Sequence, residues 1–241
     1  MAQYNTVFHT LTKILPRHEI DRLDRKYGQG DKRRKSSRYV QFIVMLMAQI
    51  LGLKSLREID HAQKSKQKRL YHLGVKSPVS RSALSRMNDE RSADFFKDVF
   101  QQMLQSCKAL APGSQVKLPH IYPEDQHEYH FITNAMHLPA QTIADIYKER
   151  WQIELFFKWI KQNLKIKTFL GTSANAVMTQ VWVALCLYLI LAFIRFISKT
   201  VHSMREILNW IRINLFSNEI LDDYLVPKMT EPIVNPQLAL F

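Results

Sequence analysis

Four polar residues of chemical interest fall on one helical stripe in the segment 145–167. Arg150, Glu154 and Lys161 follow Tyr147 by 3, 7 and 14 residues. At about 100° per residue, the four side chains project within roughly 60° of one another. A carboxylate held beside cations on a buried helix is how a metal site or a phosphate site is built. The spacing therefore predicts a helix that carries a site of one of these two kinds.

The rest of this helix is strongly apolar and must position the stripe. An amphipathic surface of this width predicts a helix that is buried on both sides of the polar residues. The apolar residues are Ile153, Leu155, Phe156, Phe157, Trp159 and Ile160.

A second apolar element follows in the run 181–194. This run has fourteen residues and is bounded by Gln180 and Arg195. Because about twenty apolar residues are needed to cross a bilayer, the run predicts a buried core helix and no membrane partner. The two cysteines, Cys107 and Cys186, lie far apart without metal-ligand spacing, which fits a reducing, cytoplasmic location.

The positive charge of the chain is concentrated in its first half. Residues 1–110 contain 22 basic and 10 acidic side chains, whereas residues 111–241 contain 12 and 11, within a total formal charge of +13. A basic unit joined to a nearly neutral one indicates a module that binds a polyanion, most commonly nucleic acid. The alternative is a solvated basic face that serves solubility.

Two segments of the first half are candidates for DNA contact. The segment 31–38 places five basic side chains in eight residues, which favours phosphate contact. A short helix over 80–89 would carry Arg81 and Arg86 on one side and could enter a groove. Together with the helix that opens at Ser55 it resembles a helix-turn-helix, but the connection is longer than in that motif. The basic residues of the first segment are Lys32, Arg33, Arg34, Lys35 and Arg38.

The chain divides by composition into four parts. Residues 1–110 form a basic helical N-terminal unit, and 111–127 form an irregular linker that begins with Ala-Pro-Gly-Ser. Residues 128–225 form a C-terminal unit, in which 128–133 reads as a short strand and a helix starts near Leu138. Residues 226–241, with three prolines from 227 onward, predict an extended tail.

The spacing Tyr147-x2-Arg150-x3-Glu154-x6-Lys161 resembles the signature of the DDE-type insertion-sequence transposases, in the branch named for its Tyr-Arg-Glu-Lys motif. The flanking residues agree with that family. Residues 4–110 resemble its N-terminal helical domain, and 128–196 resemble the end of its catalytic domain. The resemblance thus covers nearly the whole chain.

The resemblance implies an RNase H-like core in which two aspartates and one glutamate hold two divalent metals, Mg²⁺ or Mn²⁺. Two such metals promote in-line phosphoryl transfer, and hard oxygen ligands suit them. The resemblance further implies that Glu154 is the third catalytic acid and a metal ligand. It also implies that Tyr147, Arg150 and Lys161 contact DNA phosphates. A plainer alternative for Glu154 is an ion pair with Arg150 or Lys158 within the helix.

The first two aspartates of the family pattern have no clear counterpart here. Only Asp125 and Asp145 lie between the helix of Asp98 and Glu154. Asp125 is in a segment flanked by prolines, and Asp145 lies on or just before the Glu154 helix. We therefore hypothesise an internally deleted transposase. The expected fold is mainly α, with an N-terminal helical DNA-binding domain followed by a fragment of an RNase H-like α/β core that keeps very little sheet.

Three functional hypotheses follow. The chain is a transposase that acts on double-stranded DNA at transposon terminal inverted repeats. Alternatively, it is a non-catalytic DNA-binding remnant, which forms a homodimer or associates with a full-length transposase and inhibits it. In the third hypothesis, loss of the sheet leaves the two apolar helices without a packing surface, and the chain has no stable fold.

Overall fold

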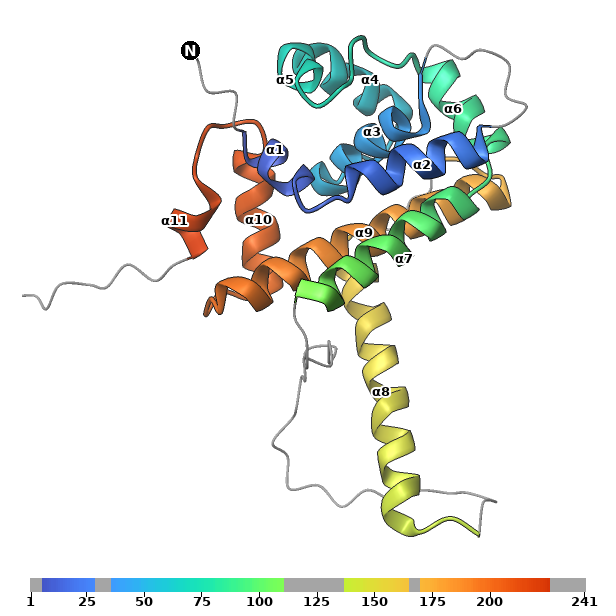
Figure 1. Cartoon of the computed structure of the whole chain (residues 1–241), viewed down its shortest axis with the longest axis vertical. Coiled ribbons are helices and arrows are strands. Elements are labelled where there is room, and N and C mark those ends of the chain that lie inside the picture. Colours follow the sequence, from blue (N-terminus) through green and yellow to red (C-terminus); the bar gives the residue numbers. More distant parts are fainter. Residues whose placement is uncertain (1–5, 29–35, 111–136, 165–169, 226–241) are drawn as a thin grey trace, which may run out of the picture.

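The computed structural model of the chain describes residues 6–28, 36–110, 137–164 and 170–225 (Figure 1). All the regular elements within these ranges are α-helices, and no strand occurs in them. A mainly α fold is therefore confirmed. The helices are α1 (Val7–Thr12), α2 (Arg17–Tyr27), α3 (Arg38–Leu51), α4 (Leu56–Ser65), α5 (Gln67–Tyr71), α6 (Arg81–Glu90), α7 (Asp94–Leu110), α8 (Ala140–Asn163), α9 (Ala174–Ser198), α10 (Met204–Asn214) and α11 (Leu221–Leu225).

Helix α3 forms one half of the centre of the core. The side chain of Ser37 accepts a hydrogen bond from the amide of Val40 and caps the start of the helix. Gly52 adopts a left-handed conformation, φ 66°, and ends it. Between these caps almost every residue of α3 is buried. An all-round apolar surface of this kind requires neighbours on every side.

Helix α9 forms the other half, and the interpretation of 181–194 as part of a buried core helix is confirmed. Ser173 caps its start, Lys199 ends it at φ 48°, and the helix packs against α3, α6, α7 and α10. The expectation that this helix lacks a packing surface is wrong, because the N-terminal helices supply one.

The length argument used for α9 is also wrong. The helix has 25 residues and extends the apolar run at both ends, so by length and composition it could cross a membrane. The bent pair α3 and α4, counted as one span, is also long and apolar enough to cross a membrane. Core helices of soluble proteins can be equally long and apolar, and half of the most apolar stretch of α9 is buried by its neighbours.

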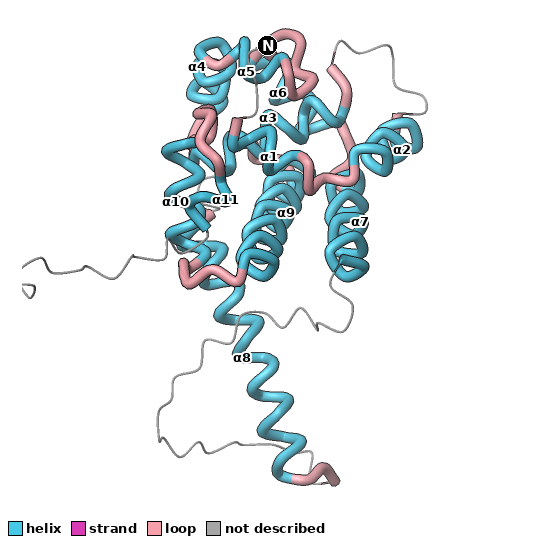
Figure 2. Tube along the Cα trace, turned by 60° about the vertical axis from the view of Figure 1, so that its left-hand side comes forward, coloured by secondary structure: helices cyan, strands magenta, loops and turns pink. Residues whose placement is uncertain are grey.

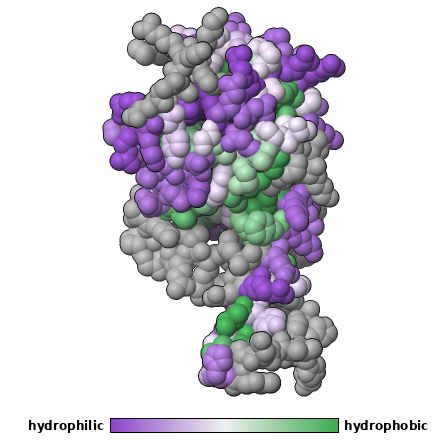
Figure 3. All heavy atoms as spheres, turned by 90° about the vertical axis from the view of Figure 1, so that its right-hand side faces the viewer, coloured by the Kyte–Doolittle hydropathy of each residue, from purple (hydrophilic) through white to green (hydrophobic). Residues whose placement is uncertain are grey.

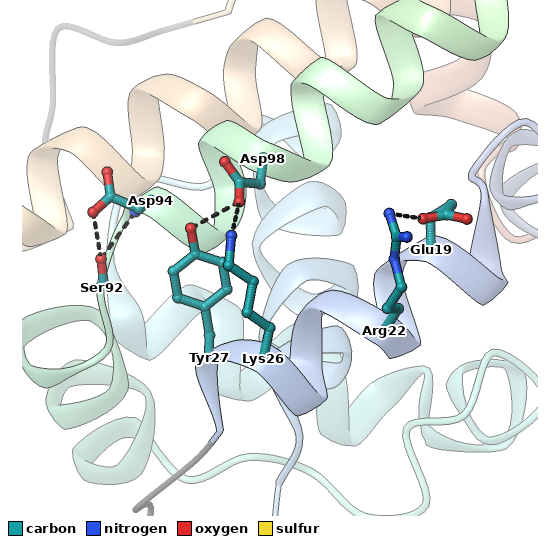
Figure 4. A network of polar contacts seen from close by, with 7 residues as sticks. All are labelled: Glu19, Arg22, Lys26, Tyr27, Ser92, Asp94 and Asp98. Atoms are coloured by element: carbon teal, nitrogen blue, oxygen red, sulfur yellow. Dashed lines mark hydrogen bonds and ion pairs between the residues drawn. The ribbon is translucent and has the colours of Figure 1, made fainter.

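Helix α2 packs along α7 through a small polar cluster (Figure 4). The carboxylate of Asp98 accepts hydrogen bonds from the Lys26 ammonium at 3.0 Å and from the Tyr27 hydroxyl at 2.8 Å. Partial burial and the bond to this carboxylate raise the pKa of Tyr27. The ring of Tyr27 also meets Phe95 edge-on, so the cluster lies at the margin of the core.

The two halves of the sequence share one hydrophobic core. The amides of Val7 and Phe8 at the start of α1 donate to the carbonyls of Ser217 and Leu215, which follow α10, at 3.2 and 2.9 Å. The first amides of α1, which have no partner within their own helix, thus bond to carbonyls that follow the end of α10. The buried cluster runs from α1 to α11, so the boundary near residue 110 does not separate two hydrophobic cores.

Helix α8 projects from this body (Figures 1 and 2). It starts at Ala140, close to the expected start near Leu138. Its C-terminal end packs on the core, where Ile160 and Leu164 are buried. The expectation of a helix buried on both sides of the polar stripe is wrong: Ile146, Trp151 and Phe157 are 53, 55 and 50% exposed. An apolar helix surface is buried only where another element lies against it.

Several expected features fall outside the described ranges. These are the linker 111–127, the strand 128–133 and the tail 226–241. The RNase H-like character of the C-terminal unit therefore stays a prediction.

Candidate nucleic-acid interface

Helices α4, α5 and α6 form a compact group beside the core, and a buried glutamine holds their spacing. The Gln63 side chain on α4 donates to the carbonyl of Val79 at 3.1 Å and accepts from the Val79 amide at 2.9 Å. Gln63 is fully buried, so both polar ends of its amide are satisfied by one backbone unit. This pair places Ser80, which caps α6 by accepting from the amide of Ala83.

The group presents a basic surface, which we call the α4–α6 basic surface. Arg81 and Arg86 are exposed on α6, whereas Leu84 and Met87 on its other side are buried, as the sequence predicts. In the space-filling view, hydrophilic residues predominate among the coloured residues in the upper part of the molecule (Figure 3). The exposed cations of this surface are Lys54, Arg57, Lys64, Lys66, Lys68, Lys76, Arg81 and Arg86.

The other predicted phosphate-binding segment is only partly described. Lys32, Arg33, Arg34 and Lys35 lie outside the described residues. Arg38 lies inside them but is only 5% exposed, and its guanidinium is 3.9 Å from the carboxylate of Asp24. Since the first residue of α3 turns inward, Arg38 is part of the packing between α2 and α3. This position does not favour a phosphate contact.

A polar clamp joins α6 to the start of α9. The Asn175 side chain donates to the carbonyls of Asn88 and Arg91 at 2.8 and 2.6 Å and accepts from the amide of Ala93 at 2.9 Å. Ser173 adds a hydrogen bond to Asp89 at 2.6 Å. The clamp fixes the turn between α6 and α7, so the C-terminal half of the chain helps to orient the α4–α6 basic surface.

We call the C-terminal end of α8, which joins the body, its root. The root is anchored through backbone carbonyls that have no hydrogen-bond partner within the helix. The guanidinium of Arg212 on α10 donates to the carbonyl of Asn163 at 2.8 Å and to that of Ile50, at the end of α3, at 2.7 Å. Gln49 donates to the carbonyl of Leu164. Burial lowers the pKa of Arg212, although arginine stays charged at neutral pH. A cation that bridges two helix C-termini is placed favourably for both dipoles.

The predicted stripe lies on the outward side of α8. The rings of Phe156 and Trp159 pack edge-on against Tyr188 of α9 at 4.8 and 5.2 Å between centroids. Counted from Glu154, these two residues lie about 160° and 140° around the helix. Glu154, and with it the stripe, therefore points away from the core.

The stripe residues contact one another along the helix. A guanidinium nitrogen of Arg150 lies 3.4 Å from the carboxylate of Glu154, and the Arg150 guanidinium carbon lies 5.7 Å from the ring centroid of Tyr147. Lys161, about two turns after Glu154, is exposed on the same side of the helix. The ion pair within the helix, the plainer of the two readings of Glu154, is therefore present. The side chains of Arg150 and Glu154 are 67 and 50% exposed, so this pair contributes little to stability.

The described residues around Glu154 do not fit a pair of divalent metals. Asp145 is nine residues earlier on the same helix, which places it about 13.5 Å away along the axis and on the opposite side. Asp145 accepts a hydrogen bond from Gln141 at 3.2 Å, and Asp125 lies outside the described residues. Among the described residues, no three His, Cys, Asp or Glu side chains come together as a metal site.

Three positioning residues escaped prediction from the sequence, namely Gln63, Asn175 and Arg212. Each is a single polar side chain that bonds to backbone groups distant in sequence. No spacing rule links such partners, so no local signal in the chain points to them.

Comparison with known proteins points to mobile genetic elements. Residues 3–76 match a family that is described as a domain of unknown function, DUF4372. The chain is 44% identical over 63 residues to the "Probable transposase for insertion sequence element IS5377" of Geobacillus stearothermophilus, which covers 26% of this chain and 17% of that protein. It is 53% identical over 60 residues to the "Putative transposase y4zB" of Sinorhizobium fredii, 25% of this chain and 17% of the relative.

A third relative is the "Putative transposase for insertion sequence element IS4SA" of a Synechocystis species, 36% identical over 81 residues. That match covers 30% of this chain and 23% of the relative. The matched stretch is thus less than a quarter of the length of each of these relatives. No solved structure matches the chain.

Proposed function

We propose that this chain is a DNA-binding protein derived from an insertion-sequence transposase, in which the catalytic centre is incomplete. The observation that carries the transposase assignment is the identity of 44 and 53% with two transposases over about sixty residues. The Tyr-Arg-Glu-Lys spacing on α8 supports the DDE branch with the same signature. Double-stranded DNA at terminal inverted repeats is the proposed ligand.

Binding is assigned to the α4–α6 basic surface. Its exposed lysines and arginines lie on α4, α5 and α6 and on the segments beside them, and Gln63 and Asn175 hold these elements in place. Cations on a rigid scaffold bind the phosphate backbone with the release of counterions, so affinity falls steeply with salt. Arg81 and Arg86 stand at the start and middle of α6, where side chains of a groove-binding helix reach DNA.

Catalytic incompleteness rests on the geometry of α8. Glu154 is paired with Arg150, and Asp145 lies on the other side of the same helix. A single carboxylate is too small a ligand set for two hard divalent metals, which need several oxygen ligands each. We therefore assign no phosphoryl-transfer step to this chain. Tyr147, Arg150 and Lys161 keep a proposed role as phosphate contacts.

The first test is a mobility shift with terminal-repeat DNA and random DNA over a series of salt concentrations. In Arg81→Ala/Arg86→Ala the slope of log affinity against log salt should fall by about 2, since about one counterion is released per phosphate contact. Arg205→Ala is the matched control, because Arg205 is exposed on α10. An unchanged slope in the double variant would reject the α4–α6 basic surface as the binding site.

The second test is incubation with end-sequence DNA and Mg²⁺ or Mn²⁺. We expect neither nicking nor joining. Strand transfer that disappears in Glu154→Ala would overturn the proposal of an incomplete centre.

An inhibitory role follows if this chain binds the same ends without cleaving them. Added to a full-length relative, it should lower strand transfer in proportion to its occupancy of the ends. Inhibition that persists in Arg81→Ala/Arg86→Ala would show that competition for DNA is not the cause.

A further inference from the structure

An exposed aromatic side chain, Tyr71 at the end of α5, stands inside the α4–α6 basic surface. Helix α5 lies at the end of the body opposite to the projecting α8 (Figure 1). Between residues 36 and 107, all of which the structure describes, Tyr71 is the only large apolar side chain that is exposed, at 56%. Leu70 and Leu73 beside it are buried. The phosphate contacts assigned above make no use of this ring.

The turn that follows α5 fixes the position of Tyr71. The Gly74 amide donates to the carbonyl of Tyr71 at 3.0 Å, and the Val75 amide donates to the carbonyl of Leu70 at 3.1 Å. These two bonds are those of a Schellman motif, in which Gly74 takes the required left-handed conformation at φ 88°. Leu70 and Val75, the two apolar positions of this motif, are both buried. The backbone that carries the ring is therefore rigid.

Side-chain contacts hold α5 and the ring in place as well. The guanidinium of Arg69 donates to the side-chain oxygen of Asn218, in the segment that follows α10, at 2.8 Å. The rings of Tyr71 and His72 meet at 89°, with 5.7 Å between their centroids. Because the ring is held before any ligand arrives, stacking on it costs little further ordering.

The surroundings of Tyr71 in sequence are uniformly positive. Residues 61–88 contain seven lysines and arginines and no aspartate or glutamate. Lys68 is exposed and lies three residues before Tyr71, so the two side chains share one side of α5. An aromatic ring among cations is the arrangement with which proteins bind a nucleic-acid strand, because the cations follow the phosphates and the ring stacks on a base.

A protein partner or a membrane would require a larger apolar area. The centre of a protein–protein contact comprises several apolar or aromatic side chains, and a membrane-bound helix inserts a whole apolar face. Among the described residues of the α4–α6 basic surface, Tyr71 is the only exposed side chain of that kind. One ring is enough for one base. In a duplex both faces of a base are covered by its neighbours, so the base must be unpaired and unstacked.

We propose that Tyr71 stacks on an unpaired DNA base, while Lys68 and the other cations of the α4–α6 basic surface hold the phosphates beside it. This inference rests on the proposed function, since it takes DNA as the ligand of this surface, and it adds single-stranded DNA to the duplex. Every base has a π face, so stacking on Tyr71 should show little preference for sequence.

A comparison of two strands separates stacking from phosphate contact. One is an oligo(dT) of about 12 nucleotides, and the other is an abasic strand of the same length, which carries the same phosphates without bases. The original chain should bind oligo(dT) about tenfold more tightly than the abasic strand. Tyr71→Ala should lose this preference and keep its affinity for the abasic strand. Fluorescence anisotropy at one salt concentration measures all four affinities.

A further variant identifies the part of the tyrosine that acts. Tyr71→Phe keeps the ring and loses the hydroxyl, so it should bind oligo(dT) within about twofold of the original chain. A tyrosine hydroxyl can also donate to a phosphate. In that case Tyr71→Phe would lose as much affinity as Tyr71→Ala, on both strands, and the stacking role would be overturned.

The salt dependence distinguishes the ring from the cation next to it. Tyr71→Ala should leave the slope of log affinity against log salt unchanged, because a neutral ring releases no counterion. Lys68→Ala should lower the slope on oligo(dT) by about 0.7. Phe196→Ala is the matched truncation control, because Phe196 is 54% exposed at the end of α9 and should not affect binding.

The failure of this inference and the failure of the proposed function give different results. If Tyr71→Ala binds oligo(dT) as the original chain does, stacking is rejected; duplex binding that still depends on Arg81 and Arg86 then leaves the proposed function standing. A chain that binds neither duplex nor single-stranded DNA rejects both. Tighter binding of oligo(U) than of oligo(dT) would reject DNA as the source of the base.

Discussion

Helices α8 and α9 come from the same half of the chain, have nearly equal lengths and are both rich in large apolar residues, yet their environments are opposite. Along α9 twelve of the 25 residues are buried, and the helix packs against four other helices. Among the α8 side chains that the structure describes, those buried lie at its C-terminal end, whereas Trp151 and Phe157 are half exposed on its outer side. The difference shows that apolar content alone does not decide burial.

The polar residues of the two helices explain why they differ. From Val181 to Ile194, α9 contains no charged side chain, so it is stable only inside a core. On α8, charged residues recur along the outer side, and they keep a projecting helix hydrated. The C-terminal end of α8 has backbone partners in Gln49 and Arg212.

The largest expected effect compares one apolar truncation on each helix. Leu187→Ala removes a fully buried side chain of α9 and should lower the free energy of unfolding by about 3 kcal/mol. Phe157→Ala on α8 should change it by less than about 1 kcal/mol, because this side chain is half exposed in the monomer. Urea unfolding measures both values. Equal losses would mean that α8 is packed in solution.

A smaller effect is expected at the α8 root. Arg212→Ala leaves the carbonyls of Ile50 and Asn163 without their donor and should destabilise the chain by about 2 kcal/mol. Hydrogen exchange of the last amides of α8 should accelerate in the same variant. Arg212→Lys should recover part of the loss, because the lysine ammonium can donate to one of the two carbonyls but does not readily reach both. If Arg205→Ala, an exposed neighbour on α10, gave the same change, the loss would reflect charge and not the bridge.

The smallest effect concerns α10, which carries Arg212. Ser203 and Glu206 form a complete capping box, and Ser203→Ala should lower stability by about 1 kcal/mol. Hydrogen bonds from the backbone and hydroxyl of Ser203 lower the pKa of Glu206. A lowered pKa means that the charged form stabilises the fold above the ordinary glutamate pKa of about 4.3. This contribution is lost as the pH falls through the lowered pKa, so the difference between the variant and the original chain should shrink in acid.

Local features of the fold were predictable where they depend on neighbours in sequence. The serine cap at Ser55, and the division of α6 into an exposed arginine side and a buried side, follow from spacing alone. The stripe on α8 was predicted for the same reason, since 100° per residue fixes which side chains share a side. The burial of Arg38 was not predictable, because it depends on Asp24 in another helix.

The sequence by itself determined the helices, their caps, the concentration of positive charge in the first half and the Tyr147–Lys161 stripe, because these depend on residues within a few turns of one another. The tertiary structure alone decided that α9 completes the N-terminal core and that α8 projects with its stripe facing outward. It also decided that Asn175 and Arg212 join distant segments through backbone carbonyls. Burial and long-range hydrogen bonds depend on which surfaces meet in space, and the order of residues along one helix does not specify that.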